Sequence, residues 1–301
     1  MNTPRHLFHP RHWPTWLGLA LLRLLVALPQ AARMWIGRRI GRALMPLLGR
    51  RVHITAVNIG LAFPELSPAA QAERVREHIE SQSLGLIELG IAWWGSDREI
   101  ARLTDIHGLD NLTAPLDAGH GVVLLSAHFA PLDLSVRALG LRLPFDFTYR
   151  PHQNPVLDHL LRRHRERNDK HHIPRDDMRA FIKALKGGRA VWYASDQNFG
   201  HKNSAFVDFF GVPAATNTAL SRIVKLGDAR VVPYFYRRRS DDRGYDIEVL
   251  PALSDFPGAD PVADAARINT LIEDAVRKAP EQYYWSHRRY KDRPDNEPRF
   301  Y

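Results

Sequence analysis

Residues 121–133 read GVVLLSAHFAPLD, and this stretch decides the fold class. The apolar run at 121–126 is short and ends at small and polar residues, which predicts a buried strand. Pro131 then breaks the chain, so we expect a loop that turns into a helix beginning at Leu132 and Asp133. A buried strand that leads directly into a helix is typical of α/β proteins.

The same alternation continues along the chain. Buried strands are predicted at 190–194 (AVWYA) and 230–236 (RVVPYFY), and the alternating segment 245–250 predicts a half-exposed strand. Ser67, followed by a proline, predicts the cap of a helix that runs toward Trp94. We therefore predict an α/β fold with a mixed, mostly parallel sheet and helices on both faces.

The N-terminal part has a different composition. Residues 16–32 are apolar except for Arg23 and Gln30, a length that is marginal for a bilayer span of about 20 residues. In the following segment, 33–49, apolar residues alternate with arginines in a pattern that suits a helix lying in the membrane interface. The sequence thus predicts an N-terminal membrane helix with an adjoining amphipathic helix.

Basic residues flank this apolar run unequally. Only Arg5 and Arg11 precede it, whereas six arginines follow within nineteen residues: Arg33, Arg38, Arg39, Arg42, Arg50 and Arg51. The asymmetry predicts a membrane-anchoring segment at 1–51 and a cytoplasmic domain at 52–301. The alternative is a buried N-terminal helix of a soluble protein, but so many arginines are hard to place inside a core.

Composition limits the chemistry. The chain of 301 residues contains no cysteine, which excludes disulfides, thiolate zinc sites and a cysteine nucleophile. It has 42 Lys and Arg against 33 Asp and Glu, a formal net charge of +9. Such a balance attracts nucleic acids, anionic lipid headgroups or acidic carrier proteins, although a solvated arginine-rich surface would give the same count.

His128 and Asp133 follow the strand at 121–126 directly. In an open α/β sheet, catalytic groups collect at the carboxyl ends of the strands. An aspartate that accepts a hydrogen bond from one imidazole nitrogen leaves the other nitrogen to act as a base toward a hydroxyl. We predict His128 as the general base and Asp133 as its orienting partner, although a His and an Asp five residues apart also occur by chance.

Several blocks, in this order, resemble the late acyltransferases of lipid A biosynthesis. They are NIGLAFPELS (58–67), LGLIELGIAWW (84–94), GVVLLSAHFAPLD (121–133), YRPHQNPVLD (149–158), AVWYASDQNFG (190–200), FVDFFGVPAATNTA (206–219) and PEQYYWSHRRYKDRP (280–294). The family carries Asp or Glu five residues after the histidine, so Asp133 fits its pattern.

The resemblance implies an activity. A fatty acyl chain carried on acyl carrier protein would pass to a hydroxyl of a lipid A precursor, on a 3-hydroxyacyl chain already attached to the disaccharide. The implied partners are the carrier protein, a phosphorylated glycolipid and the membrane, with no nucleic acid. The implied location is the cytoplasmic face of the bacterial inner membrane. No organic cofactor or metal is expected.

Three further residues are candidates for substrate binding. Asp196 follows the strand at 190–194 and matches an acidic residue of the family, where it would position either His128 or an arginine. Arg175 precedes an expected helix cap at Asp176, and Arg150 ends the segment FDFTY. The planar guanidinium of either arginine suits a phosphate or a carboxylate, although most arginines in such a chain lie on a solvated surface.

Two other functions remain open on the sequence. The first is transfer by the same family to another lipid, such as a glycerolipid, an ornithine lipid or a polyene head. The second is a membrane-associated nucleic-acid-binding module, suggested by the aromatic and basic residues of 283–293. We prefer to assign that cluster to headgroups or to the carrier protein, because the nucleic-acid function leaves His128 and Asp133 unexplained.

Overall fold

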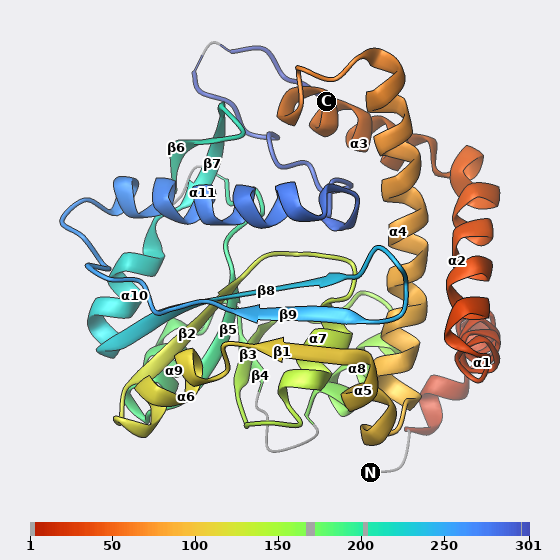
Figure 1. The fold of residues 1–301 in the computed structure, drawn as a ribbon, viewed down its shortest axis with the longest axis horizontal. Helices are drawn as coiled ribbons and strands as arrows, with labels where there is room; N and C mark the ends of the chain where they lie inside the picture. Colours follow the sequence, from red (N-terminus) through yellow and green to blue (C-terminus); the bar gives the residue numbers. More distant parts are fainter. Residues whose placement is uncertain (1–3, 167–171, 201–203, 296) are drawn as a thin grey trace.

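The computed structural model describes residues 4–166, 172–200, 204–295 and 297–301. Its main sheet has the strand order β1-β9-β8-β2-β5-β3-β4, in which β9 and β8 are antiparallel and every other neighbouring pair is parallel (Figure 1). The strands are β1 (Thr104–His107), β2 (Gly121–Ser126), β3 (Asp146–Tyr149), β4 (His172–Pro174), β5 (Ala190–Ala194), β8 (Ala229–Arg238) and β9 (Tyr245–Val249). The remaining pair forms an antiparallel hairpin, β6 (Ser204–Phe209) with β7 (Val212–Asn217).

Helices surround the sheet and form a layer beside it. The α-helices are α1 (Trp13–Val26), α2 (Gln30–Leu44), α3 (Gly49–Ala62), α4 (Pro68–Trp94), α5 (Asp97–Leu103), α6 (Asp110–Asp117), α7 (Leu132–Leu139), α8 (Pro155–Arg165), α9 (Met178–Lys186), α10 (Ala219–Gly227) and α11 (Pro261–Lys278). Short 3₁₀ turns are η1 (Arg5–Phe8), η2 (Pro10–His12), η3 (Met45–Leu48) and η4 (Pro280–Gln282).

The predicted α/β architecture is confirmed. Each of the four predicted strands is present, and β2 is buried along its whole length, as its continuous apolar sequence requires. Helices α6, α9 and α10 pack against the central strands β2, β5 and β8, while α7 contacts the long helix α4. The hairpin β6–β7 lies against α11 rather than in the main sheet (Figure 1).

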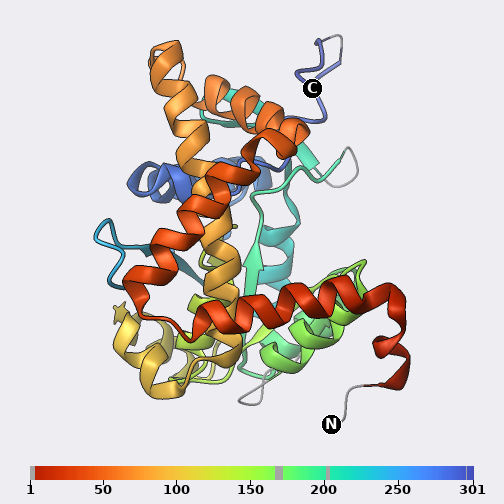
Figure 2. The same ribbon diagram turned by 90° about the vertical axis from the view of Figure 1, so that its right-hand side faces the viewer.

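Helix α4 stands between the sheet and the N-terminal helices. Its cap is the predicted one, with the Oγ of Ser67 accepting a hydrogen bond from the N–H of Ala70 at 3.3 Å. Helices α1, α2 and α3 follow one another along the outer side of α4 (Figure 2). Gly41 of α2 permits this close approach, because a Cβ there would lie 2.9 Å from the Cα of Glu80.

The predicted membrane-spanning helix is not supported. Within the described part of the chain, no helix is both long and apolar enough to cross a membrane. The apolar run at 16–32 is divided at Pro29, where α2 begins, so α1 has only 14 residues. A helix of that length measures about 21 Å, which is shorter than the hydrocarbon core of about 30 Å.

The C-terminal segment after α11 returns across the molecule to α3 and α4. The side-chain amide of Asn58 on α3 donates to the carbonyls of Trp285 and His287, at 2.6 and 2.7 Å. On α4, the buried His78 lies 3.1 Å through Nε2 from the Oγ of Ser286. These buried polar contacts fix the position of a segment that forms part of the surroundings of the site.

Candidate active site

The strands β2 and β5 bring two predicted residues together. The two strands are parallel neighbours, and Ser126 at the end of β2 pairs with Ala194 at the end of β5. His128 and Asp196 each lie two residues beyond these paired positions, so both chains leave the sheet at the same edge. The parallel register therefore places the two side chains next to each other, although 68 residues separate them in the sequence.

Asp196 binds His128 through both carboxylate oxygens. Nδ1 of the imidazole lies 2.7 Å from Oδ1, and the backbone N–H of His128 donates to Oδ2 at 2.9 Å. Asp196 is only 2% exposed, while the His128 side chain is 29% exposed. The edge of the Trp192 ring borders the imidazole, with centroids 5.9 Å apart. With Nδ1 occupied, Nε2 makes no hydrogen bond to any residue of the described ranges.

The two groups change each other's ionisation. Burial lowers the pKa of His128, but the negative charge of Asp196 and its hydrogen bond outweigh this effect and raise the pKa above the ordinary 6.5. Burial alone would raise the pKa of Asp196, whereas the charge of His128 and the hydrogen bonds hold that pKa below its ordinary value. The arrangement favours an anionic Asp196 that stabilises a positive charge on His128.

Asp133 does not occupy the predicted position on the imidazole. Its carboxylate instead accepts two hydrogen bonds from Arg165, from Nε at 2.6 Å and from a terminal nitrogen at 3.0 Å. The reason is geometric: Asp133 lies in the first turn of α7, and α7 packs against α8, which carries Arg165 at its last residue. The hydrogen bond that we expected Asp133 to accept from the imidazole of His128 is accepted by Asp196.

Arg165 is the residue of this site that the sequence did not reveal. Its side chain is 19% exposed and lies over the ring of Phe147, 5.5 Å from the centroid, on the neighbouring strand β3. Its positive charge acts to lower the pKa of His128, so the guanidinium lies within electrostatic reach of the imidazole. In the sequence it is one of several arginines in the segment LRRHRER, and nothing there distinguishes it from its neighbours.

Arg150 and Arg175 lie at the same sheet edge but in more open positions. Arg150 follows β3 and Arg175 follows β4, and both residues are exposed. The guanidinium of Arg175 approaches the carboxylate of Asp176 at 3.4 Å. The following helix α9 is capped by Asp177, one residue later than expected. Substrate binding by Arg150 and by Arg175 stays a prediction.

The C-terminal segment supports the loop that carries His128. The backbone N–H of Tyr284 donates to the carbonyl of His128 at 2.9 Å, and Tyr283 pairs with Phe129 in an antiparallel bridge. The hydroxyl of Tyr283 also donates to the carbonyl of Asp196 at 3.3 Å. Both halves of the His128–Asp196 pair are therefore held by the same segment.

Comparison with known proteins agrees with the resemblance seen in the sequence. Residues 1–292 match the sequence model of a family described as bacterial lipid A biosynthesis acyltransferase. The chain is 38% identical to a lipid A biosynthesis lauroyltransferase of Escherichia coli K12, over 98% of this chain and 97% of the relative. It is also 38% identical to the palmitoleoyltransferase of that strain, over 99% and 97%, and 28% identical to the myristoyltransferase, over 96% and 90%. The chain belongs to the bacterial lipid A biosynthesis acyltransferase family.

Proposed function

We propose that this protein transfers a fatty acyl chain from acyl carrier protein to a hydroxyl of a lipid A precursor, with His128 as the general base. Membership of the family supports the reaction class. The observation that carries the assignment of the base is the imidazole itself. Asp196 holds its Nδ1 at 2.7 Å, and Nε2 remains available at the carboxyl edge of the sheet.

In the proposed reaction, His128 makes both proton transfers. As the acceptor hydroxyl attacks the thioester carbonyl, Nε2 of His128 removes its proton and a new C–O bond forms. The tetrahedral intermediate then collapses, the C–S bond breaks, and the imidazolium returns the proton to the departing thiolate. Asp196 stabilises the imidazolium between these steps and fixes the tautomer that presents Nε2.

We also assign an electrostatic role to Arg165, which is to stabilise negative charge on the thioester oxygen. The thioester oxygen gains negative charge during the attack, and a fixed cation beside the base can stabilise it. Arg165 meets this requirement because Asp133 holds its guanidinium by two hydrogen bonds and because its charge reaches His128. Asp133 thus acts as a positioning residue for Arg165 rather than for the imidazole.

Purified protein given an acyl carrier protein loaded with a fatty chain and a lipid A precursor should produce a glycolipid that is heavier by one acyl group. Mass spectrometry of the product and release of the carrier thiol would measure the reaction. Parallel assays with a glycerolipid and an ornithine lipid as acceptors separate the alternatives. Transfer to one of these lipids, with none to the lipid A precursor, would disprove the proposed acceptor.

The raised pKa of His128 predicts the acid side of the pH profile. The base acts only when neutral, so kcat/KM should fall as the pH drops through the pKa of His128 in the free enzyme. Because Asp196 raises that pKa, the midpoint should lie above 6.5. Measurement of kcat/KM from about pH 5 to 9 tests this. A midpoint clearly below 6.5 would contradict the proposed pairing.

We also propose that the N-terminal helices attach the protein to the cytoplasmic face of the bacterial inner membrane. Large apolar side chains are exposed at one-turn spacing along α1 and continue into α2 and η3: Trp13, Leu17, Leu21, Leu24, Trp35, Ile40, Leu44 and Leu47. Such a face suits insertion into the headgroup region. The double variant Leu17→Glu/Leu21→Glu should float with anionic vesicles at least about tenfold less than the unaltered protein; equal flotation would disprove this attachment.

A further inference from the structure

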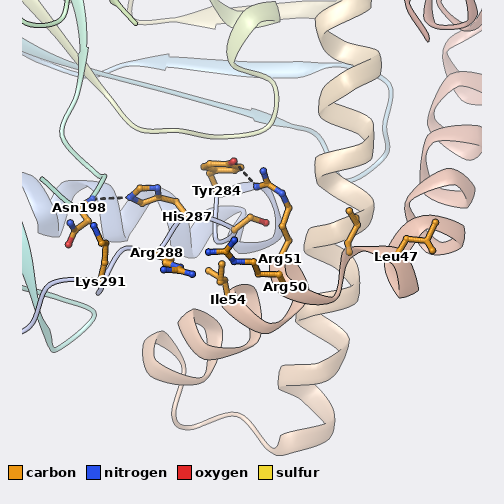
Figure 3. A pocket seen from close by; sticks show the side chains of 11 residues that line it. Leu47, Arg50, Arg51, Ile54, Asn198, Tyr284, His287, Arg288 and Lys291 are labelled. Atoms are coloured by element: carbon orange, nitrogen blue, oxygen red, sulfur yellow. Dashed lines mark hydrogen bonds between the residues drawn. The ribbon is translucent and has the colours of Figure 1, made fainter. Parts of the chain in front are cut away.

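A basic cavity lies beside the loop that carries His128. It has a volume of about 740 Å³ and opens between the start of α3 and the C-terminal segment (Figure 3). Arg50 and Arg51 line it from α3, and Arg288 and Lys291 line it from the C-terminal segment. Cationic side chains from two segments more than 230 residues apart in the chain therefore line the same cavity.

These four cations have no carboxylate partners within the described chain. No Asp or Glu lines the cavity, and none of the four side chains forms a salt bridge with a described residue. Arg51 donates to the Tyr284 hydroxyl at 3.1 Å. Arginines elsewhere are commonly neutralised; Arg38, for example, binds Asp242 at 2.6 Å. An uncompensated group of four cations in a concave site is suited to an anion.

The start of α3 adds to the positive potential. Arg50 and Arg51 lie in the first turn of the helix, which contains no acidic residue, and no side chain caps it. The free N–H groups at a helix start carry partial positive charge, so two arginines there are unfavourable for the helix itself. A bound anion would relieve this repulsion, and solvent relieves it less effectively inside a cavity.

The cavity also has an apolar wall. Leu47 and Leu48 of η3 line it, and Leu47 is 79% exposed. Ile40 and Leu44, which precede these two leucines in the chain, are also exposed and belong to the face that we propose to lie on the membrane. Cationic and apolar side chains that line the same cavity suit an amphiphile with an anionic headgroup and an apolar chain. A hollow of about 740 Å³ fits a small headgroup better than the convex surface of a carrier protein.

Backbone contacts link the cavity to the base. Tyr284, which lines it, donates through its N–H to the carbonyl of His128. His287, also in the lining, accepts a hydrogen bond through Nε2 from the N–H of Asn198 at 3.1 Å, two residues beyond Asp196. The lining residues Tyr284 and His287 thus contact both strand-end loops of the active site, and Asn198 of the loop after β5 itself lines the cavity (Figure 3).

From this arrangement we propose that the cavity binds a phosphate group of the glycolipid acceptor and so positions its hydroxyl near His128. The proposal rests on the proposed function, because it assigns a recognition site to the same acceptor. It concerns ground-state binding of a phosphorylated lipid, so it predicts an effect on acceptor affinity and not on the chemical step.

The double variant Arg50→Gln/Arg288→Gln tests the site, because it removes one cation from each side of the cavity. Its KM for the phosphorylated acceptor should rise about tenfold or more, with kcat changed much less. With a dephosphorylated acceptor, the variant and the unaltered enzyme should have equal KM values. Arg98→Gln/Arg222→Gln is the matched control, since both of its arginines are exposed and lie outside the cavity.

A second double variant, Arg50→Gln/Lys291→Gln, changes only exposed side chains and should show the same effect if the first folds poorly. The proposal fails if the KM for the phosphorylated acceptor is unchanged, or if it rises equally for the dephosphorylated one. It also fails if only the KM for the acyl carrier protein rises, which would make the cavity a carrier surface. Loss of flotation with phosphatidylglycerol vesicles, with acceptor KM unchanged, would assign the cations to bulk lipid instead.

Direct binding separates this proposal from the proposed function. The His128→Ala protein, whose turnover should be at least about a hundredfold slower, can be titrated with phosphorylated and dephosphorylated acceptor in neutral detergent micelles without acyl donor. Preference for the phosphorylated form that is lost when Arg50 and Arg288 are also replaced supports the cavity, whether or not transfer is observed. Absence of transfer by the unaltered enzyme contradicts the proposed function; absence of this preference contradicts the cavity.

Discussion

The His128→Ala variant is expected to lose about two to four orders of magnitude in kcat, because the acceptor hydroxyl would lose the group that removes its proton. The imidazole is 29% exposed and contributes little to the core, so the variant should remain folded. Initial rates of acyl transfer with saturating donor and acceptor would measure the loss. Circular dichroism and thermal unfolding would verify the fold.

His107→Ala is a suitable control for this change, because His107 is an exposed histidine at the end of β1. It should retain nearly unaltered activity. Near-normal transfer by the purified His128→Ala protein would overturn the assignment of the base. A loss confined to KM would also count against it, since a general base acts on the chemical step.

Replacing Asp196 with asparagine is expected to lower kcat by a comparable factor, about two to four orders of magnitude. The amide keeps the shape of the carboxylate but not its charge, so the imidazolium formed during the reaction loses its counter-ion. The same charge raises the pKa of His128, so the acid midpoint of kcat/KM should move to lower pH in this variant. Rates and midpoint can be read from one pH series.

Asp133→Asn provides the matched comparison, because it makes the same chemical change in the carboxylate that binds Arg165. The charge and the hydrogen bond that raise the pKa of His128 come from Asp196, so the Asp133→Asn variant should lower kcat and leave the acid midpoint in place. If the midpoint falls in Asp133→Asn and stays constant in Asp196→Asn, then Asp133 orients the base after all. The two variants therefore distinguish the sequence-based pairing from the observed one.

Arg165 links these results to the reaction itself. A Lys at this position keeps the charge but cannot make the two hydrogen bonds that Asp133 accepts from the guanidinium. The ion pair between α7 and α8 thus explains the contact that Asp133, the acidic residue of the H-x-x-x-x-D pattern, makes in the fold. Asp133 binds Arg165, whose charge acts on His128, instead of contacting the imidazole.

The local sequence was sufficient for the elements that depend on short-range patterning. Residues 121–125 form a continuous apolar run because β2 is buried on both faces, and such a run can be recognised from the sequence as a buried strand. The cap at Ser67 also follows from local chemistry, since its hydroxyl satisfies an N–H three residues away. The position of His128 after a buried strand could be predicted for the same reason.

The tertiary structure decided which groups surround that histidine. Sequence proximity favoured Asp133, five residues away, but its position in the first turn of α7 directs it to Arg165 on α8. The parallel register of β2 and β5 instead brings Asp196 to the imidazole from 68 residues away. The basic cavity likewise depends on the return of the C-terminal segment to α3. The sequence by itself determined the strand, the family and the position of His128 at the end of that strand. Three features depend instead on contacts between distant segments: the pairing of His128 with Asp196, the pairing of Asp133 with Arg165, and the gathering of four cations at one cavity. Short-range patterns carry no information about which strand ends become neighbours.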